Sequence, residues 1–394
     1  MRIKSIKQIK DLAGKVVLLR ADFNVPLCKG KVKEDFKLIM NLPTIRYLSN
    51  NKAKVVLISH LGRPEFTKSG QVSKKKQSSL ESVARRLSIL LRKKVKFVNQ
   101  IIGDKVNREI ERLKQGEILL LENLRFDPGE IKNSVKFAKK LSSMADIYVN
   151  NAFAVCHRKH ASVSAIKKYL PAYAGLLLEE EIKSLNKIKE PKKPLVIIIG
   201  GAKMDTKIGM IKKMSFKATN ILLGGAVANN FLAAKKLEIG KSLSDKASIR
   251  EAKKLMNKKI ILPTDVVVAK PNKFKPVKVK PVNYVNKGEM ILDIGPQTMR
   301  NYAKYIKEAK TIIWNGPMGM FEIKPFHHGS LFIGRVVASR SKGKAFGLVG
   351  GGETVQVLRM TKMFDNIDWV STGGGAVLAY LSNNKMPGLK KIIK

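Results

Sequence analysis

The 394-residue chain contains only two cysteines, Cys28 and Cys156, which lie far apart in the sequence. Two thiols form no disulfide framework, and they are too few to hold a zinc ion alone. The segment from His157 to His160 has H-x-x-H spacing, but no second pair of metal ligands accompanies it. The sequence therefore argues against a structural metal centre and against a disulfide-stabilised secreted domain.

Long apolar runs are also missing. No run approaches the roughly 20 residues that a membrane-spanning helix needs. The first residues, MRIKSIKQIKDLAG, are basic but lack the apolar stretch of a signal peptide. We therefore expect a cytoplasmic protein that has no membrane partner.

Acidic residues are scarce, because 30 Asp and Glu stand against 77 Lys and Arg, a formal net charge of +47. A surplus of this kind can indicate nucleic-acid binding. The lysines, however, are spread through the chain and recur on expected helix faces, as in IRYLSNNKAK and REAKKLMNKK. There is no basic tail and no basic module interleaved with aromatic residues. We therefore favour a solvated cationic surface, whose field attracts anionic substrates, over a nucleic-acid partner.

Short apolar runs alternate with longer amphipathic segments along the whole chain. Runs that are apolar on both faces, separated by helical segments such as SSLESVARRLSILLRK, are typical of a parallel sheet covered on both sides. In the first half we expect strands within residues 16–25, 54–60, 117–124 and 146–153. In the second half we expect them within residues 194–201, 219–225, 259–269, 310–317 and 344–352.

Between the two series lies the segment LLLEEEIKSLNKIKEPKKP. Its helical spacing continues to about Lys189, and Pro191 and Pro194 then stop it. We interpret the segment as a helix that joins two domains; the alternative is one more helix within a single large sheet. The expected fold class is α/β, with two doubly wound parallel-sheet domains joined by a helix and a cleft between them.

Arginine and histidine recur where the expected strands of the first half end. Planar guanidinium groups that converge on one edge of a sheet suit a small, multiply anionic ligand, and Asp22 and Asn24 offer acceptors to its hydroxyl group. One such arginine alone would be an ordinary surface residue, but arginine is scarce in this lysine-rich chain. The residues are Arg20, His60, Arg63, Arg125, Arg158 and His160.

Glycine-rich turns follow the expected strands of the second half, within residues 200–209, 224–226, 315–322, 350–354 and 371–376. Glycines let backbone N–H groups approach phosphate oxygens, and a helix N-terminus favours their charge. None of the turns matches the Walker A pattern or the dinucleotide fingerprint. Several such turns in one domain favour a nucleotide site over simple tight turns. An anionic ligand on one domain and a nucleotide on the other indicate phosphoryl transfer between them.

Eight ordered segments make the chain resemble the phosphoglycerate kinase family along essentially its whole length. They are RADFNVPL, SHLGRP, LLLENLRF, HRKHAS, GGAKMDTKIG, TIIWNGPMGMFE, GGGET and STGGGA. The resemblance implies reversible phosphoryl transfer from 1,3-bisphosphoglycerate to MgADP, giving 3-phosphoglycerate and MgATP in glycolysis and gluconeogenesis. It implies a monomeric phosphotransferase with a carboxyl group as acceptor, which works by hinge closure.

The resemblance also divides the chain into four parts. An N-terminal domain that binds 3-phosphoglycerate or 1,3-bisphosphoglycerate would span residues 1–172, and an interdomain helix and hinge residues 173–190. A C-terminal nucleotide-binding domain would span residues 191–376, and a tail, residues 377–394, would return to the N-terminal domain.

Residue roles follow from the same motifs. The substrate-binding residues implied are Arg20, Asp22, Asn24, His60, Arg63, Arg125 and Arg158. The catalytic residues implied are Lys37, Lys203, Gly351 and Gly374. Contacts to ADP or ATP are implied for Gly201, Lys207, Gly224, Gly225, Asn315, Pro317, Glu322, Gly350, Gly351, Gly352, Glu353 and Thr354. The carboxylate of Glu353 would be directed at Mg²⁺, the one cofactor expected.

The most consequential departure from the family pattern is Lys37. The family has an arginine six residues before the proline that is Pro43 here. That arginine is expected to contact the phosphoryl group during its transfer. A lysine offers a point charge on a flexible stem instead of a planar fork. The alternatives are that Lys37 is one more surface lysine, or that Lys33 is the true counterpart. We favour Lys37, because it keeps the spacing to Pro43.

Four further positions depart from the family. Glu353 replaces an aspartate in GGGET, Asn151 and Ala154 stand in VNNAFA for VNDAFG, and Ala226 stands in GGAVA for GGGMA. These changes motivate a second hypothesis, a family member with weakened catalysis that acts as a ligand-binding protein. A third hypothesis, nucleic-acid binding, rests on the net charge. We favour the active kinase.

The charge generates a first prediction. Both implied substrates are polyanions, so their apparent KM values should rise with salt, because ions screen the attraction over a Debye length of about 8 Å at physiological ionic strength. Steady-state assays from low salt to several hundred millimolar test this. Apparent KM values that stay constant over that range would exclude electrostatic attraction of the substrates.

Overall fold

The computed structural model describes residues 2–67, 75–271 and 274–393. They form two compact units, one made of Met1–Lys183 with Lys385–Lys394 and the other of Ser184–Asn384. Each unit is built on a six-stranded sheet in which all neighbouring strands run parallel. The expected class, two parallel-sheet α/β domains, is confirmed. No helix in the described residues is long and apolar enough to cross a bilayer.

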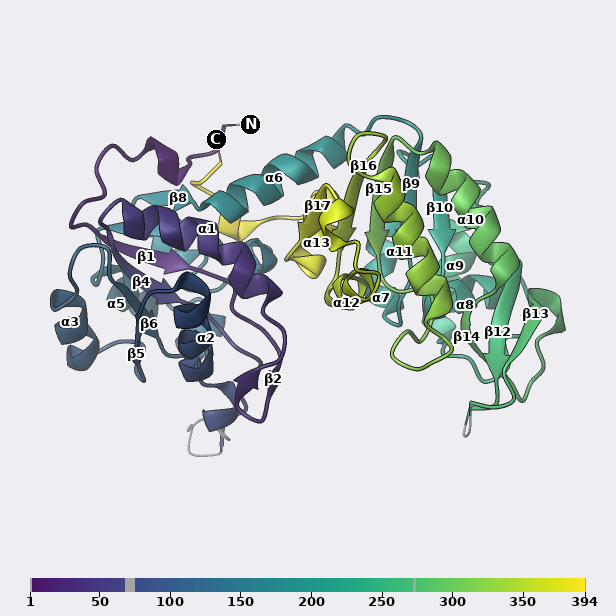
Figure 1. The fold of residues 1–394 in the computed structure, drawn as a ribbon, viewed down its shortest axis with the longest axis horizontal. Coiled ribbons are helices and arrows are strands. Elements are labelled where there is room, and N and C mark those ends of the chain that lie inside the picture. The colour runs from purple at the N-terminus through teal and green to yellow at the C-terminus, as the bar shows by residue number, and fades with distance from the viewer. Residues whose placement is uncertain (1, 68–74, 272–273, 394) are drawn as a thin grey trace. The chain divides into compact units, whose positions relative to one another are not determined.

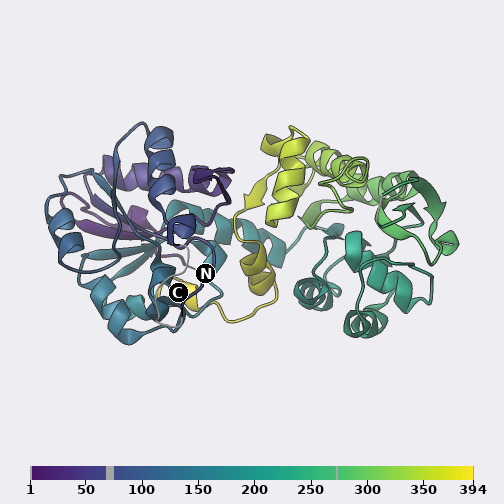
Figure 2. The same ribbon diagram turned by 90° about the horizontal axis from the view of Figure 1, so that it is seen from below.

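The sheet of the first unit owes its form to strands that are apolar on both faces. Its order is β5 (Val95–Val98), β6 (Ile118–Leu121), β4 (Lys54–Ile58), β1 (Val16–Arg20), β7 (Ile147–Asn150) and β8 (Ala172–Ala174). Helices cover both faces (Figure 2), namely α1 (Phe36–Asn50), α2 (Glu81–Leu91), α3 (Asp104–Glu111), α4 (Pro128–Ile131) and α5 (Val135–Ser142). A short hairpin, β2 (Leu27–Cys28) and β3 (Lys31–Val32), precedes α1.

The register of these strands brings distant segments together. Arg20 at the end of β1 pairs with Ile58 of β4 and with Asn150 of β7. Because parallel strands share a direction, the segments that follow β1, β4, β6 and β7 all leave the sheet at one edge. This edge is therefore where the arginines and histidines of the sequence motifs meet.

The second unit has the strand order of a dinucleotide-binding fold, with a switch point between β9 and β15. The order is β11 (Ile260–Ile261), β10 (Asn220–Leu223), β9 (Leu195–Ile199), β15 (Thr311–Asn315), β16 (Phe346–Gly350) and β17 (Trp369–Ser371). Its helices are α7 (Met204–Met214), α8 (Gly225–Ala234), α9 (Lys246–Leu255), α10 (Pro296–Glu308), α11 (His328–Arg340), α12 (Gly352–Met360) and α13 (Gly374–Leu381). Ligands of such sheets bind beyond the carboxyl ends of the strands at the switch point.

The prediction of one strand within residues 259–269 is wrong. The segment forms β11 and then β12 (Asp265–Ala269), which pairs with β13 (Lys278–Pro281) and β14 (Met290–Ile294) in a separate antiparallel sheet. Pro263 lies at the break, because proline has no N–H to donate to a strand neighbour. The short strands β5, β8, β13, β14 and β17 were not predicted from the sequence.

The joining helix forms where the spacing predicts it, as α6 (Leu176–Lys189), and the boundary between the two units falls inside it. The two ends of the chain lie together in the first unit (Figure 1): Ile3 bridges Ile393, and the N–H of Lys4 donates to the carbonyl of Ile392 at 2.8 Å. The tail that belongs to the first unit starts at Lys385, later than the expected residue 377, because residues before it form α13.

Asn151, which follows β7, connects α1 with the start of α6. Its Oδ1 accepts hydrogen bonds from the Thr44 hydroxyl at 3.0 Å and from the N–H of Leu177 at 3.1 Å. Its Nδ2 donates to Oδ1 of Asn41 at 2.7 Å. The Nδ2 of Asn41 in turn donates to the carbonyl of Lys37 at 2.8 Å. The side-chain oxygen of Asn41, and not its nitrogen, therefore faces Asn151.

This network predicts that Asn151→Asp lowers the free energy of unfolding by about 1–3 kcal/mol, because a buried carboxylate oxygen would face the Asn41 oxygen with no hydrogen between them. Asn41→Ala removes the opposing oxygen, so the double variant should recover most of the loss. Urea denaturation of all four proteins gives the double-mutant cycle. Simple additivity of the two substitutions would contradict the prediction.

Candidate functional site

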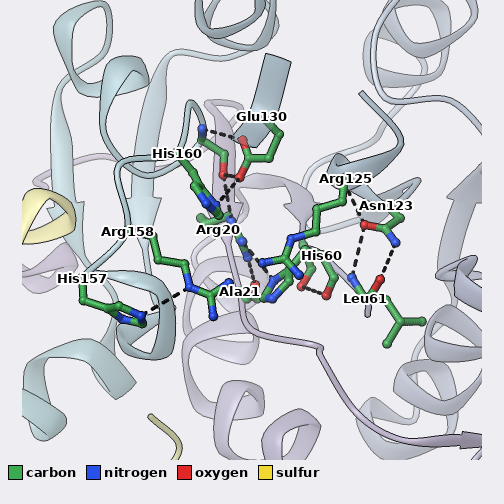
Figure 3. Close-up of polar contacts among 12 residues, drawn as sticks. Arg20, Ala21, His60, Leu61, Asn123, Arg125, Glu130, His157, Arg158 and His160 are labelled. Atoms are coloured by element: carbon green, nitrogen blue, oxygen red, sulfur yellow. Dashed lines mark hydrogen bonds and ion pairs between the residues drawn. The ribbon is translucent and has the colours of Figure 1, made fainter. Parts of the chain in front are cut away.

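Arg20 is the centre of a cationic cluster at the carboxyl edge of the first sheet. Its side chain is fully buried, and its Nε donates to the Ser162 hydroxyl at 3.0 Å. One terminal nitrogen lies 3.2 Å from Nδ1 of His60, and the other donates to the carbonyl of Ala21. Figure 3 shows Arg20, His60, Arg125 and Arg158 pointing toward one another from different segments of the chain.

Two further guanidinium groups, those of Arg125 and Arg158, point toward Arg20 (Figure 3). Burial lowers the pKa of Arg125 to about 10, and the positive charges of Arg158 and Arg20 contribute to the shift. Burial also lowers the pKa of Arg158, and the charge of Arg63 adds to the effect. Arg63 itself is exposed. The cluster is therefore a region of concentrated positive potential that favours an anionic ligand.

The histidines of the cluster are held neutral. Burial, followed by the charges of Arg20 and Arg125, lowers the pKa of His60 well below its usual value of 6.5. Burial and the same arginines lower the pKa of His160 to about 4, although its Nδ1 lies 3.8 Å from a carboxylate oxygen of Glu130. Neutral imidazoles can donate one hydrogen bond to a ligand without adding charge.

Asp22 and Lys37 lie beside the arginines. The Lys37 ammonium, on the first turn of α1, is 2.7 Å from a carboxylate oxygen of the nearly buried Asp22. The other oxygen of Asp22 accepts from the N–H of Asn24 at 3.2 Å, and the side-chain Oδ1 of Asn24 accepts from the N–H of Gly62 at 2.8 Å. Lys33, the alternative counterpart of the family arginine, is exposed beyond the hairpin.

Several positioning residues escaped the sequence analysis. Asn123 accepts the N–H of Arg125 at 3.0 Å and donates to the carbonyl of Leu61 at 2.7 Å, so it ties two motif loops together. Glu130, fully buried, accepts from the N–H and the hydroxyl of Ser162, which holds Arg20. Asn123 and Ser162 lie within two of the motif segments, LLLENLRF and HRKHAS, so their nearness to motif arginines was a sequence signal. Glu130 belongs to none of these segments and ends no strand.

In the second unit the turns after β9 and β10 are held by the loop after β15. The N–H of Gly201 donates to the carbonyl of Pro317 and that of Gly225 to the carbonyl of Met318, each at 2.8 Å. At Gly316, φ is +102° and a Cβ would lie 2.1 Å from the carbonyl oxygen of Gly200, so only glycine allows the two loops to approach. The glycines thus shape a switch-point site.

A pocket of about 220 Å³ lies at this switch point. Of the predicted nucleotide-binding residues, it is lined by Gly201, Gly225, Pro317, Glu322 and Glu353. Gly224 precedes α8 at its N-terminus, next to the pocket residue Gly225. The structure therefore brings turns from three strands to one cavity, as binding of a nucleotide between them requires.

The remaining predicted residues lie next to this pocket. The ammonium group of Lys207 donates a hydrogen bond to Oδ1 of Asn315, and Nδ2 of Asn315 donates to the carbonyl of Gly350 at 2.8 Å. Burial lowers the pKa of Lys207 to about 8, against the attraction of Glu353. Lys203 is exposed at the residue before α7.

The loops that begin α12 and α13 also meet. A Cβ on Gly374 would lie 3.0 Å from the Cα of Gly351, so two helix N-termini approach each other closely. Thr354 is buried, and its hydroxyl accepts from the N–H of Gly316 at 2.7 Å. Gly352 is the first residue of α12. This arrangement offers backbone N–H groups to an anion.

Asp293 is a pocket residue that the sequence analysis missed. It lies near the end of the antiparallel strand β14, which was not predicted, and it lines the pocket. Its carboxylate accepts from the N–H groups of Gly329 at 2.7 Å and Ile294 at 2.9 Å. Burial raises its pKa to about 7. Asp293 therefore ties the end of β14 to the first turn of α11.

A resident metal centre is not built into the part of the chain described here. No group of three or more His, Cys, Asp or Glu side chains in it is arranged to hold a metal ion. Glu353, exposed in the first turn of α12, is the predicted metal-directed carboxylate. Such a site fits only an ion whose other ligands come from a bound molecule.

Comparison with known proteins agrees with the resemblance of the motifs. Residues 6–384 match the family model described as phosphoglycerate kinase. A phosphoglycerate kinase of Wolbachia (strain wRi) is 41% identical over 100% of this chain and 99% of its own, and one of Moorella thermoacetica is 44% identical over 96% of both.

Solved structures give the same result. Phosphoglycerate kinase from Coxiella burnetii superposes with a TM-score of 0.84 at 36% identity, covering 99% of both chains. The enzyme from Pyrococcus horikoshii superposes with a TM-score of 0.88 at 30% identity, covering 99% of this chain and 98% of its own.

The buried histidines predict a loss of stability in mild acid. Unfolded histidine has a pKa of 6.5 and folded His160 one of about 4, so the unfolded chain binds more protons between these values. The contribution of His160 is complete above about pH 6.5 and is lost as the pH falls toward 4. The urea midpoint should therefore fall between pH 7 and pH 5, and less steeply for His160→Gln. An equally steep fall in that variant would contradict the assignment of this pH dependence to His160.

Proposed function

Because the chain belongs to the phosphoglycerate kinase family, we propose that its arginine cluster binds 3-phosphoglycerate or 1,3-bisphosphoglycerate and that its glycine turns bind ADP or ATP. The reaction is the family's: reversible phosphoryl transfer from 1,3-bisphosphoglycerate to ADP in glycolysis and gluconeogenesis, catalysed by a phosphotransferase with a carboxyl group as acceptor. The assignment of each residue to its ligand is the proposal.

One observation supports the phosphoglycerate assignment above all others. The side chains of Arg20, Arg125 and Arg158 point toward one another, and burial, followed by the positive charges of Arg158 and Arg20, lowers the pKa of Arg125 to about 10. An anion bound among them relieves this repulsion, and guanidinium groups pair with carboxylate and phosphate oxygens in a bidentate manner. His60 and Asn24 would orient the hydroxyl and carboxylate ends of the ligand.

In this proposal, Lys37 and Lys203 stabilise the negative charge of the phosphoryl group during its transfer. The phosphoryl group spreads its charge over three oxygens, and positive groups aimed at them supply much of the rate. Lys37 is held near the site by Asp22, from which its ammonium can turn to a phosphoryl oxygen. The N–H groups at Gly351 and Gly374, where two helices begin, would hold phosphate oxygens of the nucleotide.

Mg²⁺ fits this site only as a partner of the nucleotide. Glu353 supplies one carboxylate, and the described residues hold no further cluster of acidic ligands. Magnesium commonly keeps waters and binds one or two carboxylates together with substrate phosphates. When bound, the ion would neutralise phosphate charge, while Lys207 and the turn from Gly350 to Thr354 would position the nucleotide.

The two substrates bind to different units in this proposal, so neither unit alone would be competent. Transfer then requires closure about α6, within which the units divide. We also infer that the protein works as a monomer in the cytoplasm, in line with the family. No specific observation favours weakened catalysis or nucleic-acid binding as the main function.

The proposal predicts that Lys37→Ala lowers kcat by about 10²-fold or more, the scale of losing one preorganised charge-stabilising group. The Kd for 3-phosphoglycerate should change much less, because the contact forms mainly in the transition state. Lys37→Arg should retain or raise activity. Coupled steady-state assays with Mg²⁺ in both directions measure these effects and test the activity of the wild-type protein.

Lys33→Ala is the matched control, because Lys33 lies four residues away and is exposed. Its kcat should equal that of the wild type. Urea midpoints of all variants separate a catalytic loss from a folding defect, since Lys37→Ala also removes the partner of Asp22. Unchanged turnover in Lys37→Ala with a large loss in Lys33→Ala would transfer the role to Lys33.

A further inference from the structure

A second cationic pocket lies in the first unit, where the C-terminal tail packs against the segment after His160. Its volume is about 690 Å³, within the range of pockets that enclose small ligands. No acidic and no aromatic side chain is among the described residues that line it. Six of its lining residues are lysines, namely Lys159, Lys167, Lys168, Lys385, Lys390 and Lys391. None of them belongs to the arginine cluster or to the glycine turns.

The tail wall of this pocket is held by Lys167. This side chain is only 3% exposed, and its ammonium donates to the carbonyl oxygens of Pro387 at 2.6 Å and Lys390 at 2.8 Å. The N–H of Gly388 donates to the carbonyl of Cys156 at 2.8 Å. The tail is therefore fixed on both sides of the turn that carries Lys390, and the pocket exists before a ligand binds.

The lysines around the pocket are not neutralised by the protein. Within residues 2–67, 75–271 and 274–393, no ion pair joins an acidic side chain to any of the six. Burial lowers the pKa of Lys167 to about 8, and the charges of Lys391 and Lys390 add to the shift. The fold thus keeps like charges close together, an arrangement that an anion would stabilise.

We propose that this pocket binds a small polyphosphate anion, with several phosphoryl groups in a compact chain or cluster. Lysine ammonium groups are point charges on flexible stems, so they can gather around phosphoryl oxygens without a fixed fork geometry. Five exposed lysines with one buried lysine beneath them match a ligand of high charge and small size. A single nucleic-acid strand gains much of its affinity from bases that stack on aromatic rings, and the described lining of this pocket has no aromatic ring.

The test measures binding of inorganic tripolyphosphate to the full-length protein by isothermal titration calorimetry. Saturating 3-phosphoglycerate and ADP, without metal, occupy the kinase site. The variant Lys390→Gln with Lys391→Gln removes two charges from the rim but keeps the backbone carbonyl that Lys167 requires. The wild type should bind one tripolyphosphate per chain, and the double variant should bind at least about 10-fold more weakly.

The control is Lys235→Gln with Lys236→Gln. This pair is also adjacent and exposed, and Lys236 has a positive φ of 63° as Lys391 has one of 67°. It removes the same charge from the other unit, so its effect should be less than about twofold. Lys168→Gln, on the opposite wall of the pocket, gives a second test that leaves the tail untouched, and should also weaken binding.

Acetylation of lysines by a water-soluble reagent, followed by mass spectrometry, locates the bound anion. Tripolyphosphate should protect the five exposed pocket lysines and leave Lys235 and Lys236 reactive. Equal affinity in the wild type and the rim variants, or no protection in the pocket, would overturn the proposal. Protection by random duplex DNA but not by tripolyphosphate would also overturn it, in favour of a nucleic-acid surface. If the kinase site is assigned wrongly, extra binding appears that the rim variants do not change.

Discussion

The parallel register of the two sheets is the constraint on which every proposed site residue depends. In the first unit it aligns Arg20 with Ile58 and Asn150, so loops that are far apart in the chain leave the sheet at one edge. Guanidinium groups from those loops then lie close together, although their positive charges repel one another. Buried hydrogen bonds hold them there: Ser162 accepts from Arg20 and is itself held by the buried Glu130. In our proposal, a ligand with several negative charges completes this arrangement.

The candidate anion site of the second unit is built from backbone groups more than from side-chain cations. Its sheet brings the turns after β9, β10 and β15 to the switch point, where backbone groups of Gly201 and Gly225 bond to the loop after β15. Side-chain cations are fewer here, and burial lowers the pKa of Lys207 to about 8. Backbone N–H groups at helix N-termini suit phosphates that must bind and leave in each cycle, because they attract charge without a strong ion pair.

The net charge of +47 has no single explanation in the structure. Part of it lies in the arginine cluster, where pKa shifts mark real crowding of like charges. Another part surrounds the tail pocket, where Lys167 is buried beneath exposed lysines. Most of the remaining lysines are on solvated faces, where water and counter-ions screen them. Burial and mutual proximity, rather than the number of lysines, therefore distinguish the candidate anion sites.

The sequence by itself determined the class of fold, the joining helix and the family, because apolar periodicity and motif order are local properties that survive without coordinates. It also identified the arginines at the strand ends, since the carboxyl ends of parallel strands must share an edge.

Only the tertiary structure decided which residues support them. Glu130 and Asp293 act through burial and hydrogen bonds to segments distant in the chain, so no local pattern marks them. Ser162 lies in the HRKHAS segment, but only the fold brings its hydroxyl to Arg20. The small antiparallel sheet escaped prediction because β13 and β14 gain their stability from pairing with β12, and such short strands have little preference of their own. The pairing of Lys37 with Asp22 likewise depends on how α1 packs on the sheet, where it contacts β4, and spacing along the chain does not determine this packing.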